Sequence, residues 1–271
     1  MDIIHALILG VVQGITEFLP ISSTGHLLAL HEIFKYDLAD SLNFDAALHL
    51  GTLLALIFFF WKEVVLIIKH FFLSLRNWQV KTDENQKLAW LVIIGAIPAG
   101  VAGIVLDKFI ENHTRNLILV AVALIFGSMV IWWAEAWSKR QQQTNQINFK
   151  TAWLIGLVQI MALIPGISRS GATIIGGLFR KLDRPTATRY AFLVSLPVVA
   201  GAGLLKLADL FKSHPGGNEL TQVLIGIITS AIVGYFVIKY FLKFVQNHSL
   251  STFAWYRVVA AILLLIFVWI K

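Results

Sequence analysis

Long runs of residues without any charge recur along the chain, and they constrain its fold more than any other feature. They cover residues 88–106, 117–134, 151–168, 190–205 and 220–238. Most of them are close to the ~18 to 20 residues with which a helix crosses about 30 Å of hydrocarbon. They are continuously apolar rather than alternating, which favours helices over the strands of a membrane barrel. The sequence therefore predicts an all-α polytopic membrane protein.

The composition agrees with this interpretation. Hydrophobic residues make up 58% of the chain and charged residues 14%, a balance that a water-soluble domain does not need. The first apolar segment has no basic region and no small-residue cleavage pattern, so we expect it to stay in the mature chain. The chain has no cysteine, which excludes a disulfide, a thiolate metal site and a cysteine-based phosphatase mechanism.

The sequence also contains two related halves. LGVVQGITEFLPISSTGHL at 9–27 aligns with IGLVQIMALIPGISRSGAT at 155–173, and GAIPAGVAG at 95–103 aligns with GIITSAIVG at 226–234. We predict a single integral membrane domain over 1–271. It consists of repeat one (about 1–137), a polar linker (138–149) and repeat two (about 150–271).

Each repeat begins with a hydrophobic segment that is broken by a turn rich in Pro, Gly and Ser, at 20–25 and 165–171. The apolar stretches that follow, 27–34 and 171–179, cover less than half of the bilayer at about 1.5 Å per residue. We therefore expect a re-entrant helix-loop-helix in each repeat, followed by three transmembrane helices. These helices are expected near 46–67, 88–106 and 117–136 in repeat one, and near 187–208, 220–242 and 253–270 in repeat two.

Three crossings is an odd number, so the second repeat must enter the membrane from the opposite side and the two repeats are inverted. If the loop at 69–87 is cytoplasmic, most Lys and Arg residues, Arg257 among them, lie on the inside and both termini lie outside. This topology accounts for the net charge of +7 without a nucleic-acid partner. The two broken loops then dip in from opposite faces, and their tips can meet within the membrane.

Four ionisable residues fall where this topology places hydrocarbon: Glu17, His26, His49 and Arg169. An ionisable side chain at that depth is costly unless it is paired or hydrated. Because Glu17 and Arg169 have opposite charges and belong to the two facing loops, we expect them to share one polar cavity. A purely structural ion pair is the alternative, and His49 either lines the cavity or makes a hydrogen bond between two helices.

Hydroxyl groups and glycine-containing turns surround these residues. The turns lead into helix N-termini, whose unpaired N–H groups and positive dipole suit a phosphate, and a guanidinium can hold two phosphate oxygens at once. Close helix packing is the alternative role for the Ser, Thr and Gly residues. The predicted phosphate-binding residues are Ser22, Thr24, Gly166, Ser168, Arg169, Ser170, Gly171 and Thr173.

The same region offers groups for catalysis. Glu17 can help to hold a hard divalent cation, and Gln13, one helical turn earlier, can add a neutral oxygen ligand. His26 can transfer protons near neutral pH, and Ser23 is a hydroxyl close to it in the sequence. We expect Glu17, Ser23, His26 and Arg169 to be catalytic. Ser23 is the favoured nucleophile, and attack by His26 or by a water that His26 activates are the alternatives.

The motifs QGITEFLPISSTGHL and PGISRSGAT, in duplicated halves, closely resemble those of the bacterial undecaprenyl-diphosphate phosphatases, also known as bacitracin-resistance proteins. The resemblance covers essentially the whole chain. It implies removal of the terminal phosphate of undecaprenyl diphosphate, which regenerates the carrier lipid of peptidoglycan synthesis and confers resistance to bacitracin. The family motifs fall on Gln13, Glu17, Ser23, His26, Pro165, Gly166, Ser168, Arg169, Ser170 and Thr173.

The resemblance further implies a polyprenyl diphosphate substrate and a divalent cation, Mg²⁺ or alternatively Ca²⁺. It also implies a multi-pass location in the bacterial inner membrane, among membrane lipids, with the site open to the periplasmic side; the oligomeric state is left open. Gln13 leaves one carboxylate in a motif that can hold two, which weakens a metal site there. A secondary transporter or lipid flippase, which can share inverted repeats and broken helices, is the alternative. The acid-phosphatase type of lipid phosphatase is disfavoured because Ile175 stands where its signature needs a histidine.

Overall fold

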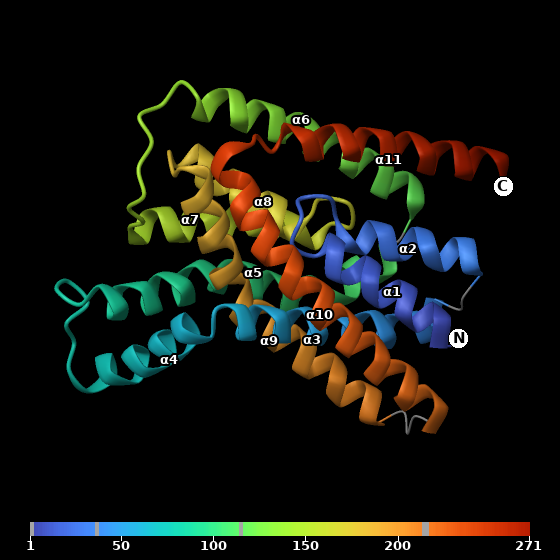
Figure 1. Ribbon diagram of the computed structural model, residues 1–271, viewed down its shortest axis with the longest axis horizontal. Coiled ribbons are helices and arrows are strands. Elements are labelled where there is room, and N and C mark those ends of the chain that lie inside the picture. The colour runs from blue at the N-terminus through green and yellow to red at the C-terminus, as the bar shows by residue number, and fades with distance from the viewer. Residues whose placement is uncertain (1–2, 36–37, 114–115, 213–216) are drawn as a thin grey trace.

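The computed structural model describes residues 3–35, 38–113, 116–212 and 217–271, and it contains helices and no strand within these ranges. Figure 1 shows repeat one in blue to green and repeat two in yellow-green to red. The helices of the first half are α1 (Ile3–Thr16), α2 (Ser23–Phe34), α3 (Leu38–Phe59), α4 (Trp61–Arg76), α5 (Glu84–His113) and α6 (Leu117–Ser138). Those of the second half are α7 (Phe149–Gln159), the 3₁₀ turn η1 (Ile160–Leu163), α8 (Arg169–Phe179), α9 (Arg184–Lys212), α10 (Gly217–Asn247) and α11 (Ser251–Ile270).

Both halves begin with two short helices around a loop, as the sequence predicts. α1 and α2 have 14 and 12 residues, and α7 and α8 have 11 each. None of them reaches the roughly 20 residues of a membrane crossing. The helix-loop-helix of each repeat is thus confirmed, and the matching order of helices in the two halves is consistent with inverted repeats.

Four helical segments of the described chain are long and apolar enough to cross a membrane: Glu84–Leu106, Leu117–Ser138, Glu219–Asn247 and Ser251–Ile270. They contain four of the six predicted crossings. α9 covers the predicted segment 187–208 as one continuous helix, which contains Pro197. All of these elements are helices, so the expected class of an all-α polytopic membrane protein is confirmed.

The predicted crossing near 46–67 is corrected by the structure. The chain breaks at Phe60, and the helices Phe44–Phe59 and Trp61–Arg76 meet at 86°. α4 is amphipathic: it exposes Trp61 and Phe72 and also carries the charged Lys62 and Glu63. The straight apolar segment therefore ends at Phe59, and the two helices together form a broken membrane span or a re-entrant loop.

The short helices around the two loops pack against longer helices of the molecule. α8 packs against α6, α7 and α9, and α1 packs against α10. Close contact depends on glycines: a Cβ on Gly10 would come within 2.9 Å of the Gly226 carbonyl oxygen, and one on Gly156 within 2.4 Å of the Gly95 carbonyl oxygen. Every residue of α8 from Ser170 to Leu178 is buried. The loop before α8 therefore has a rigid support.

Candidate active site

The tips of the two loops are in direct contact. The Gly166 amide, in the second loop, donates a hydrogen bond of 3.1 Å to the Ser22 hydroxyl in the first. In return the Ser170 hydroxyl donates to the carbonyl oxygen of Leu19 at 2.9 Å. The predicted meeting of the two tips is therefore confirmed.

The two loops end in the same local structure. Ser22 and Ser168 are the N-caps of α2 and α8, both have φ 72°, and their hydroxyls accept hydrogen bonds from the amides of Gly25 and Gly171 at 3.3 and 3.2 Å. Serine is favoured at this position because its oxygen pairs with an otherwise free N–H group. A positive φ is uncommon for a non-glycine residue. Here the cap and the loop contacts hold it, and the N-termini of α2 and α8 come together.

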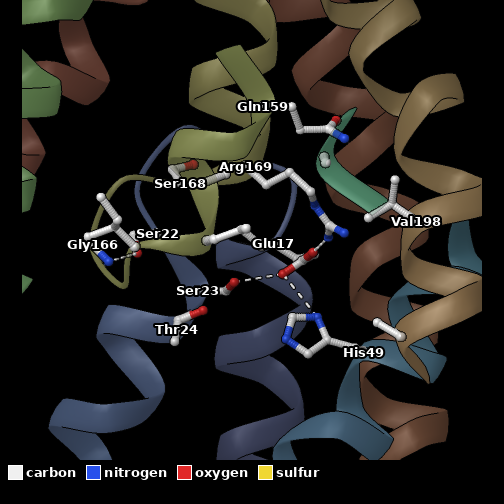
Figure 2. A pocket seen from close by; sticks show the side chains of 15 residues that line it. Glu17, Ser22, Ser23, Thr24, His49, Gln159, Gly166, Ser168, Arg169 and Val198 are labelled. Carbon is white, nitrogen blue, oxygen red and sulfur yellow. Dashed lines mark hydrogen bonds and ion pairs between the residues drawn. The ribbon is translucent and has the colours of Figure 1, made fainter. Parts of the chain in front are cut away.

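Glu17 and Arg169 form an ion pair at this point. Arg169 Nη2 donates to Glu17 Oε1, while Glu17 Oε2 accepts from the Ser23 hydroxyl at 2.6 Å and from Gln13 Nε2 at 3.1 Å. His49 Nδ1, on α3, lies 3.4 Å from the same carboxylate oxygen and 2.9 Å from Gln13 Nε2. Only 4% of the Glu17 side chain is exposed. Figure 2 shows the carboxylate surrounded by Arg169, Ser23 and His49.

These groups line a cavity of about 200 Å³. Its polar wall is made of Glu17, Ser22, Ser23, Thr24, His49, Gln159, Gly166, Ser168 and Arg169, and its apolar wall of Ala99, Ala162, Leu163, Ile164, Val198 and Ala202. The shared polar cavity expected for Glu17 and Arg169 is confirmed. A cavity with one charged wall and one apolar wall suits a ligand that has a polar head group and a hydrophobic chain.

Several predicted site residues lie behind this wall rather than on it. The Ser170 hydroxyl donates a hydrogen bond to the carbonyl oxygen of Leu19, and the Thr173 hydroxyl donates one to the carbonyl oxygen of Arg169. The Gly171 amide donates to Ser168. These three residues stabilise the turn that precedes α8, and the Gln13 amide positions the Glu17 carboxylate by a hydrogen bond.

His26 is also placed away from the cavity. Its Nδ1 lies 2.7 Å from the Ser22 carbonyl oxygen and its Nε2 lies 2.8 Å from the Tyr256 hydroxyl. Its ring stacks on that of Tyr256, with 5.7 Å between the ring centroids. His26 is therefore not among the residues that line the cavity, and its catalytic role stays a prediction.

Two further residues of the site were not identified from the sequence. Gln159 lines the cavity, is 1% exposed, and its Nε2 has no hydrogen-bond partner; its alignment with Gln13 was a usable signal. Arg257 was counted among cytoplasmic charges, and this is wrong, because the residue is fully buried and donates to backbone carbonyls of both loops. An isolated arginine within the apolar helix α11 was the signal for it.

The fit of a divalent cation to these residues is partial. Within the described chain no group of three or more His, Cys, Asp or Glu residues is placed to hold a metal. Arg169 engages one oxygen of Glu17, and Ser23 and Gln13 engage the other. Gln13 Oε1 is buried and has no hydrogen-bond partner. One carboxylate and one such oxygen suit Mg²⁺, which in many sites keeps several waters and takes further ligands from a substrate's phosphates.

Comparison with known proteins identifies similar chains. The family model described as bacitracin resistance protein BacA matches residues 6–263. A protein of Geotalea daltonii named undecaprenyl-diphosphatase is 39% identical over 269 residues, which cover 99% of each chain. Proteins of the same name are 40% identical in Methanosphaera stadtmanae, over 98% of each chain, and 41% identical in Mycolicibacterium smegmatis, over 98% of this chain and 96% of that one.

Proposed function

The chain belongs to the bacitracin resistance protein BacA family, and from this premise we propose that it is an undecaprenyl-diphosphatase. It hydrolyses the phosphoanhydride bond of undecaprenyl diphosphate to give undecaprenyl phosphate, the carrier lipid of peptidoglycan synthesis, and inorganic phosphate. One observation carries the proposal. The lone acid of the first loop and the lone guanidinium of the second meet in one cavity that has an apolar wall.

The diphosphate binds between the N-termini of α2 and α8. Arg169 has a planar fork that can hold two phosphate oxygens, and Ser22, Thr24 and Ser168 line the same wall. Free amides at the two helix ends add donors and a positive dipole. The prenyl chain leaves along the apolar wall toward the surrounding membrane lipids. Ser170, Gly171 and Thr173 support binding by holding the turn.

Ser23 is the nucleophile in this proposal, and Glu17 is its general base. Their oxygens are 2.6 Å apart, within the reach that proton transfer needs. The Ser23 oxygen attacks the terminal phosphorus as its proton passes to Glu17, and the bond to the bridging oxygen breaks, so undecaprenyl phosphate leaves. Glu17 gives this proton to the leaving undecaprenyl phosphate and then takes a proton from a water that attacks the phosphoserine. Phosphate is released as the bond to the Ser23 oxygen breaks, and this oxygen recovers a proton from Glu17. Arg169 and the helix N-termini stabilise the charge on the transferred group.

A divalent cation, Mg²⁺ or Ca²⁺, would be held by the substrate's phosphate oxygens together with Glu17 and Gln13. When bound, it neutralises charge on the diphosphate. His26 contributes indirectly, because its contact with the Ser22 carbonyl oxygen steadies the turn that presents Ser23. We place the protein in the bacterial inner membrane with both termini outside, as the distribution of Lys and Arg suggests, and with the cavity open to the periplasmic side, as the family resemblance implies.

The proposal is tested with purified protein in detergent. It should release phosphate from undecaprenyl diphosphate, while Glu17→Ala and Arg169→Ala remain monodisperse and nearly inactive. Full activity of either variant would remove the assignment of that residue. Movement of a labelled lipid across vesicles without any release of phosphate would favour the transporter or flippase.

A further inference from the structure

Arg257 on α11 is fully buried, and each of its guanidinium donors is used. Nη1 donates to the carbonyl oxygens of Pro20 and Ile167 at 3.0 and 3.1 Å. Nη2 donates to those of Gly166 and Ala123 at 3.0 and 3.2 Å, and Nε to that of Leu124 at 3.2 Å. A guanidinium has five N–H groups in a fixed plane, so all five bind a backbone oxygen here.

The acceptors come from three parts of the chain that meet only in the folded protein. Pro20 belongs to the first loop, Gly166 and Ile167 to the second, and Ala123 and Leu124 to α6. In the described chain Arg257 has no carboxylate within ion-pair distance. A charge within a membrane is costly, and this one is balanced only by carbonyl dipoles. Its position joins both loop tips to the pair α6 and α11.

α6 is shaped to admit the guanidinium. A Cβ on Gly127 would lie 2.0 Å from Arg257 Nη2 and 2.8 Å from Cζ. Any side chain at this position would displace the guanidinium. Lysine at 257 could not replace it either, because an ammonium has three donors around one point instead of a planar fork.

We propose that Arg257 is a positioning residue, which holds the two loop tips at the separation that the diphosphate requires. Arg169 and Ser23 lie on opposite loops. Arg257 fixes the carbonyl group two residues before the first N-cap and the carbonyl groups one and two residues before the second. Its part in the reaction rests on the proposed function, whereas its part in the separation of the tips does not. The two parts can therefore be tested separately.

The separation can be measured by cross-linking, because the chain has no cysteine of its own. A Cβ on Gly171 would lie 3.3 Å from the Pro20 Cβ, just below the roughly 3.5–4.5 Å of a disulfide. We expect the double variant Pro20→Cys/Gly171→Cys to form the disulfide quickly in monodisperse protein. Adding Arg257→Met or Arg257→Lys should slow it by about tenfold or more. An unchanged rate in the folded fraction of both variants would overturn the proposal, whatever the protein's activity.

Kinetics test the catalytic part. Arg257→Lys and Gly127→Ala should each lower kcat by about 10- to 100-fold, since a displacement of about 1 Å can cost that much, with KM changed by less than about threefold. Gly127→Ala keeps the charge and moves only its position. Gly100→Ala is the matched control, because its Cβ would meet nothing within 4 Å, and it should keep the parent kcat. A lower melting temperature with unchanged kcat in both test variants would reduce Arg257 to a structural residue. An inactive parent with an Arg257-dependent cross-linking rate would instead refute the proposed function.

Discussion

Two buried ion pairs of this protein are nearly identical in exposure, and they allow catalysis to be separated from stability. In the pair of Glu17 and Arg169 the side chains are 4% and 23% exposed, and in the pair of Glu135 and Arg184 they are 3% and 21% exposed. Glu135 accepts from Arg184 Nη2 at 2.6 Å and from the Leu250 amide at 2.9 Å. It is not part of the cavity wall. Glu17→Gln and Glu135→Gln are thus matched substitutions.

Each glutamine leaves an arginine without its charge partner. Removal of one member of a buried pair costs about 3–5 kcal/mol, and because both guanidinium groups are partly exposed we expect about 3 kcal/mol for each variant. Only Glu17→Gln also removes the base that accepts the Ser23 proton. General bases contribute about 10²- to 10⁴-fold, so kcat should fall by that factor in Glu17→Gln and by less than about threefold in Glu135→Gln.

The assay is phosphate release from undecaprenyl diphosphate by the monodisperse fraction of each variant, with thermal unfolding of the same samples. Similar losses of stability and very different losses of kcat are expected. The reasoning fails if Glu17→Gln keeps kcat within tenfold of the parent, because Glu17 would then be a structural partner of Arg169. It also fails if Glu135→Gln loses as much kcat as Glu17→Gln.

Three further substitutions test the other assignments. Ser23→Ala should lower kcat by about 10³-fold or more and abolish a trapped phosphoenzyme; a loss of only about tenfold would mean that water attacks directly. Gln159→Glu keeps the oxygen that faces Thr173 but replaces the unpartnered donor by an anion, so KM should rise by about tenfold; an unchanged KM would remove Gln159 from the binding wall. A chelator should abolish phosphate release, and added Mg²⁺ should restore it. Gln13→Glu should lower the half-activating Mg²⁺ concentration by several-fold. Full activity in the presence of chelator would refute the requirement for a divalent cation.

The meeting of Glu17 and Arg169 could be predicted from the sequence for a physical reason. Both charges stand in apolar segments too short to cross the membrane, and the repeat with its odd number of crossings requires the two loops to approach from opposite faces. Charged residues within apolar segments and an internal repeat can both be recognised in the amino-acid sequence. Together they predict that Glu17 and Arg169 meet at the centre of the site.

Other features depend on contacts that the sequence does not specify. The break at Phe60 contains neither proline nor glycine, and the apolar residues of α4 continue the hydropathy of α3. Only the spacing of Lys62 and Lys69, seven residues apart on one helical face, marks the change to an amphipathic helix. The partners of His26 and Arg257 could not be predicted for a similar reason. The direction in which a side chain leaves its helix decides its partner. His26 contacts Tyr256, and Arg257 binds the carbonyl groups of the two loops.

The alignment of the two repeats separates what the scaffold supplies from what the chemistry requires. Ser22 aligns with Ser168, and these two residues have the same φ and make the same cap. The equivalent positions Ser23 and Arg169 differ, and Glu17 aligns with Leu163. Symmetry thus provides two helix N-termini. In the proposed mechanism, divergence gives one loop the nucleophile and its base and gives the other loop the guanidinium that binds phosphate. Because Ser23 and Arg169 lie on different loops, this mechanism predicts that catalysis depends on the distance between the loops, which is the quantity that we propose Arg257 controls.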